Sequence, residues 1–172
     1  PKTVRSGQHL GGIVAESLTI QSSAKKGALQ INVRNLTIVA VQVNLPGIAI
    51  EQLVATGIQP GGANNYQTLL LGLSNTGTVM LKAHGSLQVF DNQAHLLQSQ
   101  LLNLDTFLPQ TAINYPVYLK NRALGAGDYR ATLTLTYGHG HILAYTMAFT
   151  ITQHQLTQVF KSSPPLLNPG LK

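Results

Sequence analysis

The chain has 172 residues and a formal net charge of +6, with 44% hydrophobic but only 9% charged residues. This length allows one large or two small domains, and the absence of cysteine excludes a disulfide framework and any thiolate metal site. No apolar run approaches the roughly 18–20 residues of a membrane helix, so we expect no membrane span in this chain.

The basic residues are scattered along the chain, and Lys25-Lys26 is the one adjacent pair. A nucleic-acid surface usually gathers Lys and Arg on one face and interleaves aromatic residues for stacking, so the sequence predicts no specific nucleic-acid partner. A diffuse positive field instead favours weak attraction to anionic cell-wall polymers. Thr, Gln and Asn supply much of the polar surface, which is typical of extracellular β-proteins and predicts an extracellular location.

Residues 1–47 read as a short β unit. A glycine pair leads into a strand that contains Ile13 and Val14, residues 29–34 alternate strictly, and residues 36–43 form a long β-branched run that ends at Pro46-Gly47. At most three strands are present, and about 45 residues cannot close a stable sandwich alone. We therefore expect an incomplete β-sandwich unit.

Residues 48–152 contain seven strand-like segments separated by turn signals, which predicts an Ig-like antiparallel β-sandwich. Pro60 to Asn65 is expected to be a loop, Gly85 to mark a bulge or bend, and Pro116 to confine its strand to an edge or bulge position. The expected strands are 48–59, 66–73, 79–90, 95–104, 111–119, 127–137 and 142–151.

The last two of these strands form the clearest hairpin. Apolar and Thr-rich positions alternate along residues 129–137 and 142–151 around the turn Gly138-His139-Gly140, as a half-buried strand pair requires. Tyr129 follows Leu124-Gly125-Ala126-Gly127-Asp128 in the manner of a tyrosine corner. The predicted core residues of the hairpin are Tyr129, Leu133, Leu135, Tyr145 and Phe149.

Two groups of residues resemble the bacterial WxL-interacting protein family. Gly7-Gln8-His9-Leu10-Gly11-Gly12-Ile13-Val14, with a later strand ending in Asn44-Leu45-Pro46-Gly47, resembles the end of the family's peptidoglycan-binding domain, although Ser6 stands where Pro is common. Leu73-Ser74-Asn75-Thr76-Gly77, Phe107-Leu108-Pro109, Tyr115-Pro116-Val117 and Leu124 to Tyr129 resemble its Ig-like, host-binding domain. The resemblance implies a non-enzymatic module of the bacterial cell surface that acts in envelope attachment or adhesion.

Candidate chemistry is sparse. His139 and His141 flank a glycine turn and could bind a metal with His84, His95 or His154, but exposed hairpin-tip residues are the simpler interpretation because a site needs three converging ligands. The five acids are widely spaced, and Asp91 and Asp128 occupy positions suited to capping turns. No serine lies in a nucleophile elbow. We expect no metal, no cofactor and no enzymatic activity.

Residues 153–172 are expected to form an extended C-terminal tail, either a leash or a peptide that docks on a neighbouring chain. The apolar strands of residues 1–47 need cover, which a separate upstream piece of the same precursor or another copy of the chain could supply. The second route defines an alternative function, a filament subunit assembled by strand complementation. Its hypothetical assembly interface comprises Ile13, Val14, Ile31, Val33, Val39, Val41, Leu156, Val159, Phe160, Leu166 and Leu167.

Overall fold

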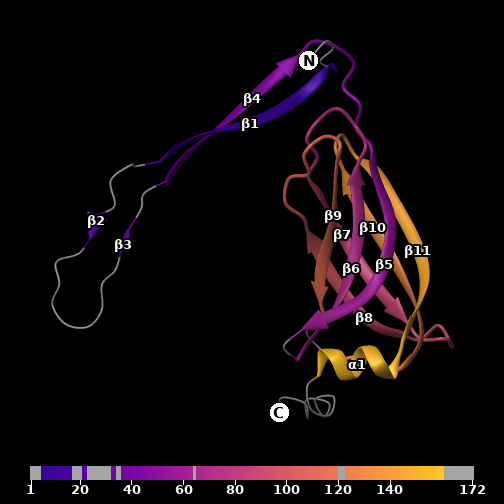
Figure 1. Cartoon of the computed structure of the whole chain (residues 1–172). Coiled ribbons are helices and arrows are strands. Elements are labelled where there is room, and N and C mark those ends of the chain that lie inside the picture. The colour runs from indigo at the N-terminus through magenta and orange to yellow at the C-terminus, as the bar shows by residue number, and fades with distance from the viewer. Residues whose placement is uncertain are drawn as a thin grey trace. The chain divides into compact units, whose positions relative to one another are not determined.

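The computed structural model describes residues 5–16, 21–22, 32–33, 36–63, 65–119 and 123–160, and these residues are almost entirely β-structure (Figure 1). By their internal contacts they belong to two compact units, Pro1–Ile48 and Ala49–Lys172. Each unit is described by itself. Three residues of the predicted assembly interface lie outside the described residues: Ile31, Leu166 and Leu167.

The first unit is a long antiparallel pair of strands. β1 (Gly7–Glu16) pairs with β4 (Leu36–Leu45) in an unbroken register from Gly7 opposite Leu45 to Glu16 opposite Leu36. The short strands β2 (Gln21–Ser22) and β3 (Asn32–Val33) form a separate two-stranded pair. The β-branched run and the glycine-pair strand predicted in this segment are therefore confirmed, and they are each other's partners.

The second unit is an antiparallel β-sandwich, as predicted. One sheet has the order β5-β6-β9 and the other the order β11-β10-β7-β8 (Figure 1). β9 lies at the edge of its sheet, which is one of the two positions predicted for it, because Pro116 has no backbone N–H to donate to a neighbouring strand. The strands are β5 (Leu53–Ala63), β6 (Tyr66–Asn75), β7 (Ala83–Phe90), β8 (Leu96–Asn103), β9 (Thr111–Tyr118), β10 (Gly127–Tyr137) and β11 (His141–Ile151).

The core lies between the two sheets and is mainly aliphatic. β6 and β10 supply its centre with alternate residues that are fully buried, since a period of two places them all on one face of each strand. These residues are Leu69, Leu71 and Leu73 of β6, and Ala131, Leu133 and Leu135 of β10. Because the central strands are so well covered, the sandwich can stand without a disulfide bond.

The β10–β11 hairpin has the predicted register, with Leu133 opposite Tyr145 and Tyr129 opposite Phe149. Leu133, Leu135 and Phe149 are buried, whereas Tyr129 and Tyr145 are half-buried against the core. Both phenols keep a polar tip, which favours a half-buried position. The Tyr129 hydroxyl donates to the Gly125 carbonyl oxygen at 3.1 Å, so the predicted tyrosine corner is present.

Two local predictions were wrong. The stretch from Pro60 is not a loop, because β5 continues to Ala63 and pairs there with Tyr66; an edge strand tolerates Pro60. Gly85 marks no bulge, since it pairs regularly with both Leu135 and Leu102. A Cβ at Gly85 would collide with the backbone oxygen of Thr134, so glycine is required here by the close approach of β10.

The expectation of an extended tail from Gln153 was also wrong, because Gln153–Val159 forms the helix α1. Thr152 caps it: the side chain accepts from the Gln155 backbone N–H, and the Gln155 side chain accepts from the Thr152 backbone N–H. Leu156, Val159 and Phe160 follow the helical i, i+3, i+4 spacing and are buried in the sandwich core.

Candidate binding surfaces

The paired strands β1 and β4, here called the β1–β4 ribbon, have apolar residues on both faces. Residues directly opposite each other share a face, so one face holds Ile13 with Val39 and the other holds Val14 with Ile38. The first face continues through Val41 and Val43, and the second through Leu10 and Leu36. A ribbon that is apolar on both faces is typical of strands covered on both sides.

These side chains are nevertheless exposed in this chain. Ile13 is 64% exposed, Ile38 69% and Val39 54%, against 2% or less for the central residues of the sandwich such as Leu133. A two-stranded hairpin is at best marginally stable in water, because it has no third layer to exclude water from its side chains. Contiguous exposed apolar surface of this kind marks an interaction site.

The predicted assembly residues divide into two groups. Ile13, Val14, Val39 and Val41 lie together on the ribbon and are exposed. Val33 lies in β3, where its side chain is not described. By contrast, Leu156, Val159 and Phe160 are buried in the chain's own sandwich. Assigning them to a strand that leaves for another copy was wrong, because their helical spacing and capped start direct them onto their own core.

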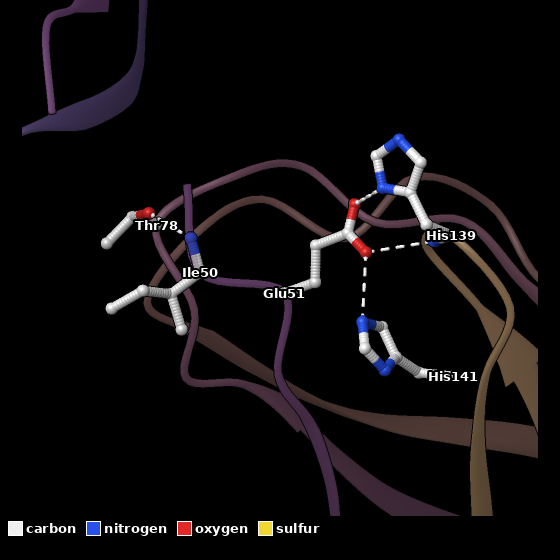
Figure 2. Close-up of polar contacts among 5 residues, drawn as sticks. All are labelled: Ile50, Glu51, Thr78, His139 and His141. Atoms are coloured by element: carbon white, nitrogen blue, oxygen red, sulfur yellow. Dashed lines mark hydrogen bonds and ion pairs between the residues drawn. The ribbon is translucent and has the colours of Figure 1, made fainter. Parts of the chain in front are cut away.

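A polar cluster joins the first residues of the sandwich to the tip of the β10–β11 hairpin (Figure 2). The Glu51 carboxylate accepts the backbone N–H of His139 at 2.9 Å and lies 2.7 Å from its Nδ1, while the Nε2 atom of His141 lies 3.4 Å away. The Glu51 side chain is only 15% exposed, whereas that of His139 is 92% exposed. Two hydrogen bonds between Ile50 and Thr78 hold the adjoining backbone.

The surroundings of Glu51 favour its charged form. The backbone N–H of His139 is the largest cause that lowers the pKa of the Glu51 carboxyl below 4.5, and partial burial opposes it. The side chains of His139 and His141 lower this pKa further through a hydrogen bond and their charge. The cluster can thus tie the start of β5 to the hairpin tip, or bind a polar ligand at the exposed His139 ring.

Sequence reasoning did not find this cluster. Glu51 and His139 are 88 residues apart in the chain, so no local spacing brings them together. Asp91, in contrast, was recognised as a turn cap: its carboxylate accepts the backbone N–H groups of Gln93 and His95 at 2.9 and 2.8 Å. Asp128 accepts the Thr150 hydroxyl across the β10–β11 pair at 2.6 Å.

Metal-binding clusters and membrane-spanning helices are both absent from the described residues. In that part of the chain no group of three or more His, Asp or Glu residues is arranged to hold a metal ion. No helix among the described residues is both long and apolar enough to cross a membrane. One hollow of about 270 Å³ lies between β8 and β9 and is bordered by Gln100, Tyr115 and Tyr118.

The model of one protein family matches residues 21–161 of the chain, and its description is "WxL Interacting Protein, host binding domain". The match takes in β4 and α1 together with the whole sandwich, and it begins inside the segment that sequence analysis assigns to the preceding domain. No curated protein matches the chain, and no solved structure does. The chain belongs to the WxL interacting protein family, within which its matched region is the host binding domain, a cell-surface interaction module.

Proposed function

We propose that this chain is a non-enzymatic adhesion module of the bacterial surface, in which the β1–β4 ribbon attaches the sandwich to a protein partner by strand addition. The observation that carries the proposal is the exposure of aliphatic side chains on both faces of an otherwise regular strand pair. Strand addition satisfies backbone groups along a free sheet edge and buries alternate side chains on each face.

The ribbon defines the chemistry of its partner. Its central residues carry no charge from Leu10 to Ala15 or from Leu36 to Leu45, so the partner surface is apolar rather than ionic. Because both faces are apolar, the partner has to supply a sheet edge with covering layers above and below it, as an open β-sandwich does. The family description names proteins with a WxL domain as interaction partners, and we take such a protein as the attachment partner.

The sandwich provides the other half of the module. Its rigid core supports loops and strand faces rich in Thr, Gln and Asn, which suit adaptable polar contacts with a host surface. We assign the host contact to the sandwich and the attachment to the ribbon, so that one chain bridges the bacterium and its host. The filament alternative loses support because Leu156, Val159 and Phe160, its expected donor, fill the chain's own core.

The test separates the two contacts in the full chain. Ile13 and Val39 lie directly opposite each other, so the double substitution Ile13→Gln/Val39→Gln removes apolar surface from one face of the ribbon. Binding to an immobilised WxL-domain protein of the same bacterium is measured by interferometry. We expect at least about tenfold weaker binding from the loss of two buried aliphatic side chains.

The matched control is Ile142→Gln, which replaces an exposed aliphatic residue of the sandwich strand β11. It should bind the WxL-domain protein as tightly as the unsubstituted chain. Adhesion of both variants to cultured host cells should be unchanged if neither replaced residue touches the host. Equal binding of the double variant and the unsubstituted chain to the WxL-domain protein would disprove attachment through the ribbon.

A further inference from the structure

The strand β8 forms an edge of the sandwich. It is the terminal strand of the sheet ordered β11-β10-β7-β8, while at the other end β11 lies against β5. Proteins usually protect such edges with proline, a charge or a β-bulge. The edge strands β5 and β9 of the second sheet carry Pro60 and Pro116. β8 contains neither proline nor a charged residue, and its one irregularity is a shift of register at Leu97, between the pairs Val89–Gln98 and Phe90–Leu96.

Apolar side chains project from this edge strand. Leu101 is 87% exposed and Leu97 is 37% exposed, and with Ser99 they occupy alternate positions on the outer face. Gln98 and Leu102 point the other way and are buried. The outward positions therefore offer leucine and a small hydroxyl side chain, with no charge to oppose a second protein surface.

The sequence of β8 is a palindrome about Ser99. Read outwards from Ser99, both directions give Gln, Leu and Leu. If two copies pair antiparallel about a twofold axis at Ser99, Leu97 of each copy lies opposite Leu101 of the other, and Gln98 lies opposite Gln100. A twofold interface requires such self-complementarity, because the same patch has to serve both partners.

We propose that β8 is a homodimer interface, through which the four-stranded sheets of two copies join into one continuous sheet. The occupant of the edge is a second copy of this chain, selected by the palindrome and by the absence of charge. Each chain has a net charge of +6, and an uncharged strand keeps like charges out of the closest contact. A dimer presents its binding surfaces twice, which raises avidity without any new contact to the ligand.

A single introduced cysteine tests the register, since the chain contains none of its own. Ser99→Cys in the full chain places two thiols opposite each other on the twofold axis, and we expect mild oxidation to yield a disulfide-linked dimer as the main product. Ala144→Cys is the matched control, because Ala144 is also exposed but lies on β11. It should remain uncrosslinked under the same conditions.

Light scattering over a range of concentrations tests the interface itself. Leu101→Lys places a charge in the contact, opposite Leu97 of the other copy, and should weaken dimerisation at least about tenfold. Ile142→Lys, at an exposed position of β11, should leave dimerisation unchanged. A monomer at all concentrations would overturn the proposal. So would a dimer that survives Leu101→Lys and is abolished by Ile13→Gln/Val39→Gln, because the β1–β4 ribbon would then hold the two copies together. Absence of the Ser99→Cys crosslink in a dimeric chain would also overturn it.

Discussion

The Glu51 carboxylate and the backbone N–H of His139 are joined by a hydrogen bond of 2.9 Å across 88 residues of sequence. This contact fixes the segment that leads into β5 against the tip of the β10–β11 hairpin. Glycine suits position 138 because its φ of +54° is left-handed, and a Cβ there would also displace the Glu51 carboxylate. The end of the sandwich where the chain enters is thus closed by a polar contact, whereas its opposite end is capped by α1.

The first prediction concerns the pH dependence of this contact. Because the pKa of Glu51 is lowered in the folded state, its stabilising effect is present above the ordinary value of 4.5 and is lost as the pH falls through the folded-state pKa. The unsubstituted chain should therefore lose stability when the pH falls from neutral to below 4.5, and Glu51→Gln should lose less over the same range. Thermal unfolding of both proteins across that range measures the difference.

His139→Ala is the informative companion to that experiment. The backbone N–H, which is the largest cause of the lowered pKa, remains in this variant, so NMR titration should still place the pKa of Glu51 below 4.5. A return of that pKa to 4.5 in His139→Ala would show that the imidazole, and not the backbone, controls the carboxylate.

The second prediction concerns the centre of the core. Leu133 is 1% exposed, and Leu133→Ala should lower the free energy of unfolding by about 2–5 kcal/mol because it leaves a cavity between the sheets. Thr134→Ala is the control on the same strand, since Thr134 is exposed and its loss should change stability by no more than about 0.5 kcal/mol. Equal denaturation curves for the two variants would refute the register of β10.

The third prediction concerns the close approach of β7 and β10. Gly85→Ala forces the backbone of Thr134 to move, and we expect a cost at the upper end of about 1–3 kcal/mol in the free energy of unfolding. Gly125→Ala meets nothing within 4 Å and should be nearly neutral. Chemical denaturation measures the free energy of unfolding of both variants. A Gly85→Ala protein that is as stable as the unsubstituted chain would contradict the close approach of β7 and β10.

The fourth prediction concerns α1. Thr152→Ala removes the hydroxyl that accepts the Gln155 N–H, and it should cost about 0.5–2 kcal/mol. Thr157→Ala, within the helix, removes only a bond to the Gln153 carbonyl and serves as the control. If thermal unfolding gave both variants the same midpoint as the unsubstituted chain, the helix cap would contribute nothing to the sandwich.

Short sequence patterns correctly predicted the features that depend only on neighbouring residues in the chain. Alternation along β10 and β11 gave their register, and the tyrosine corner followed from Tyr129 and the glycines before it. The helix α1 was missed although Thr152-x-x-Gln155 is a capping-box sequence, because strand-rich surroundings favoured an extended interpretation. Gly85 was misread because close backbone approach and bulging both select glycine.

The binding surfaces were harder to predict for a different reason. The strands of the β1–β4 ribbon were recognisable from their apolar residues, but only the structure shows that they pair with each other and leave both faces exposed. The contact between Glu51 and His139 depends on the folded arrangement of distant segments, which periodicity does not encode. The palindrome in β8 is visible in the sequence, yet its meaning depends on β8 being an edge strand.

Hydrogen exchange of the full chain, alone and with the WxL-domain protein, tests the central claim most directly. Strand addition buries the backbone of the ribbon, so amides of residues 7–16 and 36–45 that exchange quickly in the free chain should be protected in the complex. Amides of the sandwich core around Leu133 should be protected equally in both states. Binding that protects only residues of the sandwich and leaves the β1–β4 ribbon exchanging as before would contradict attachment through the ribbon.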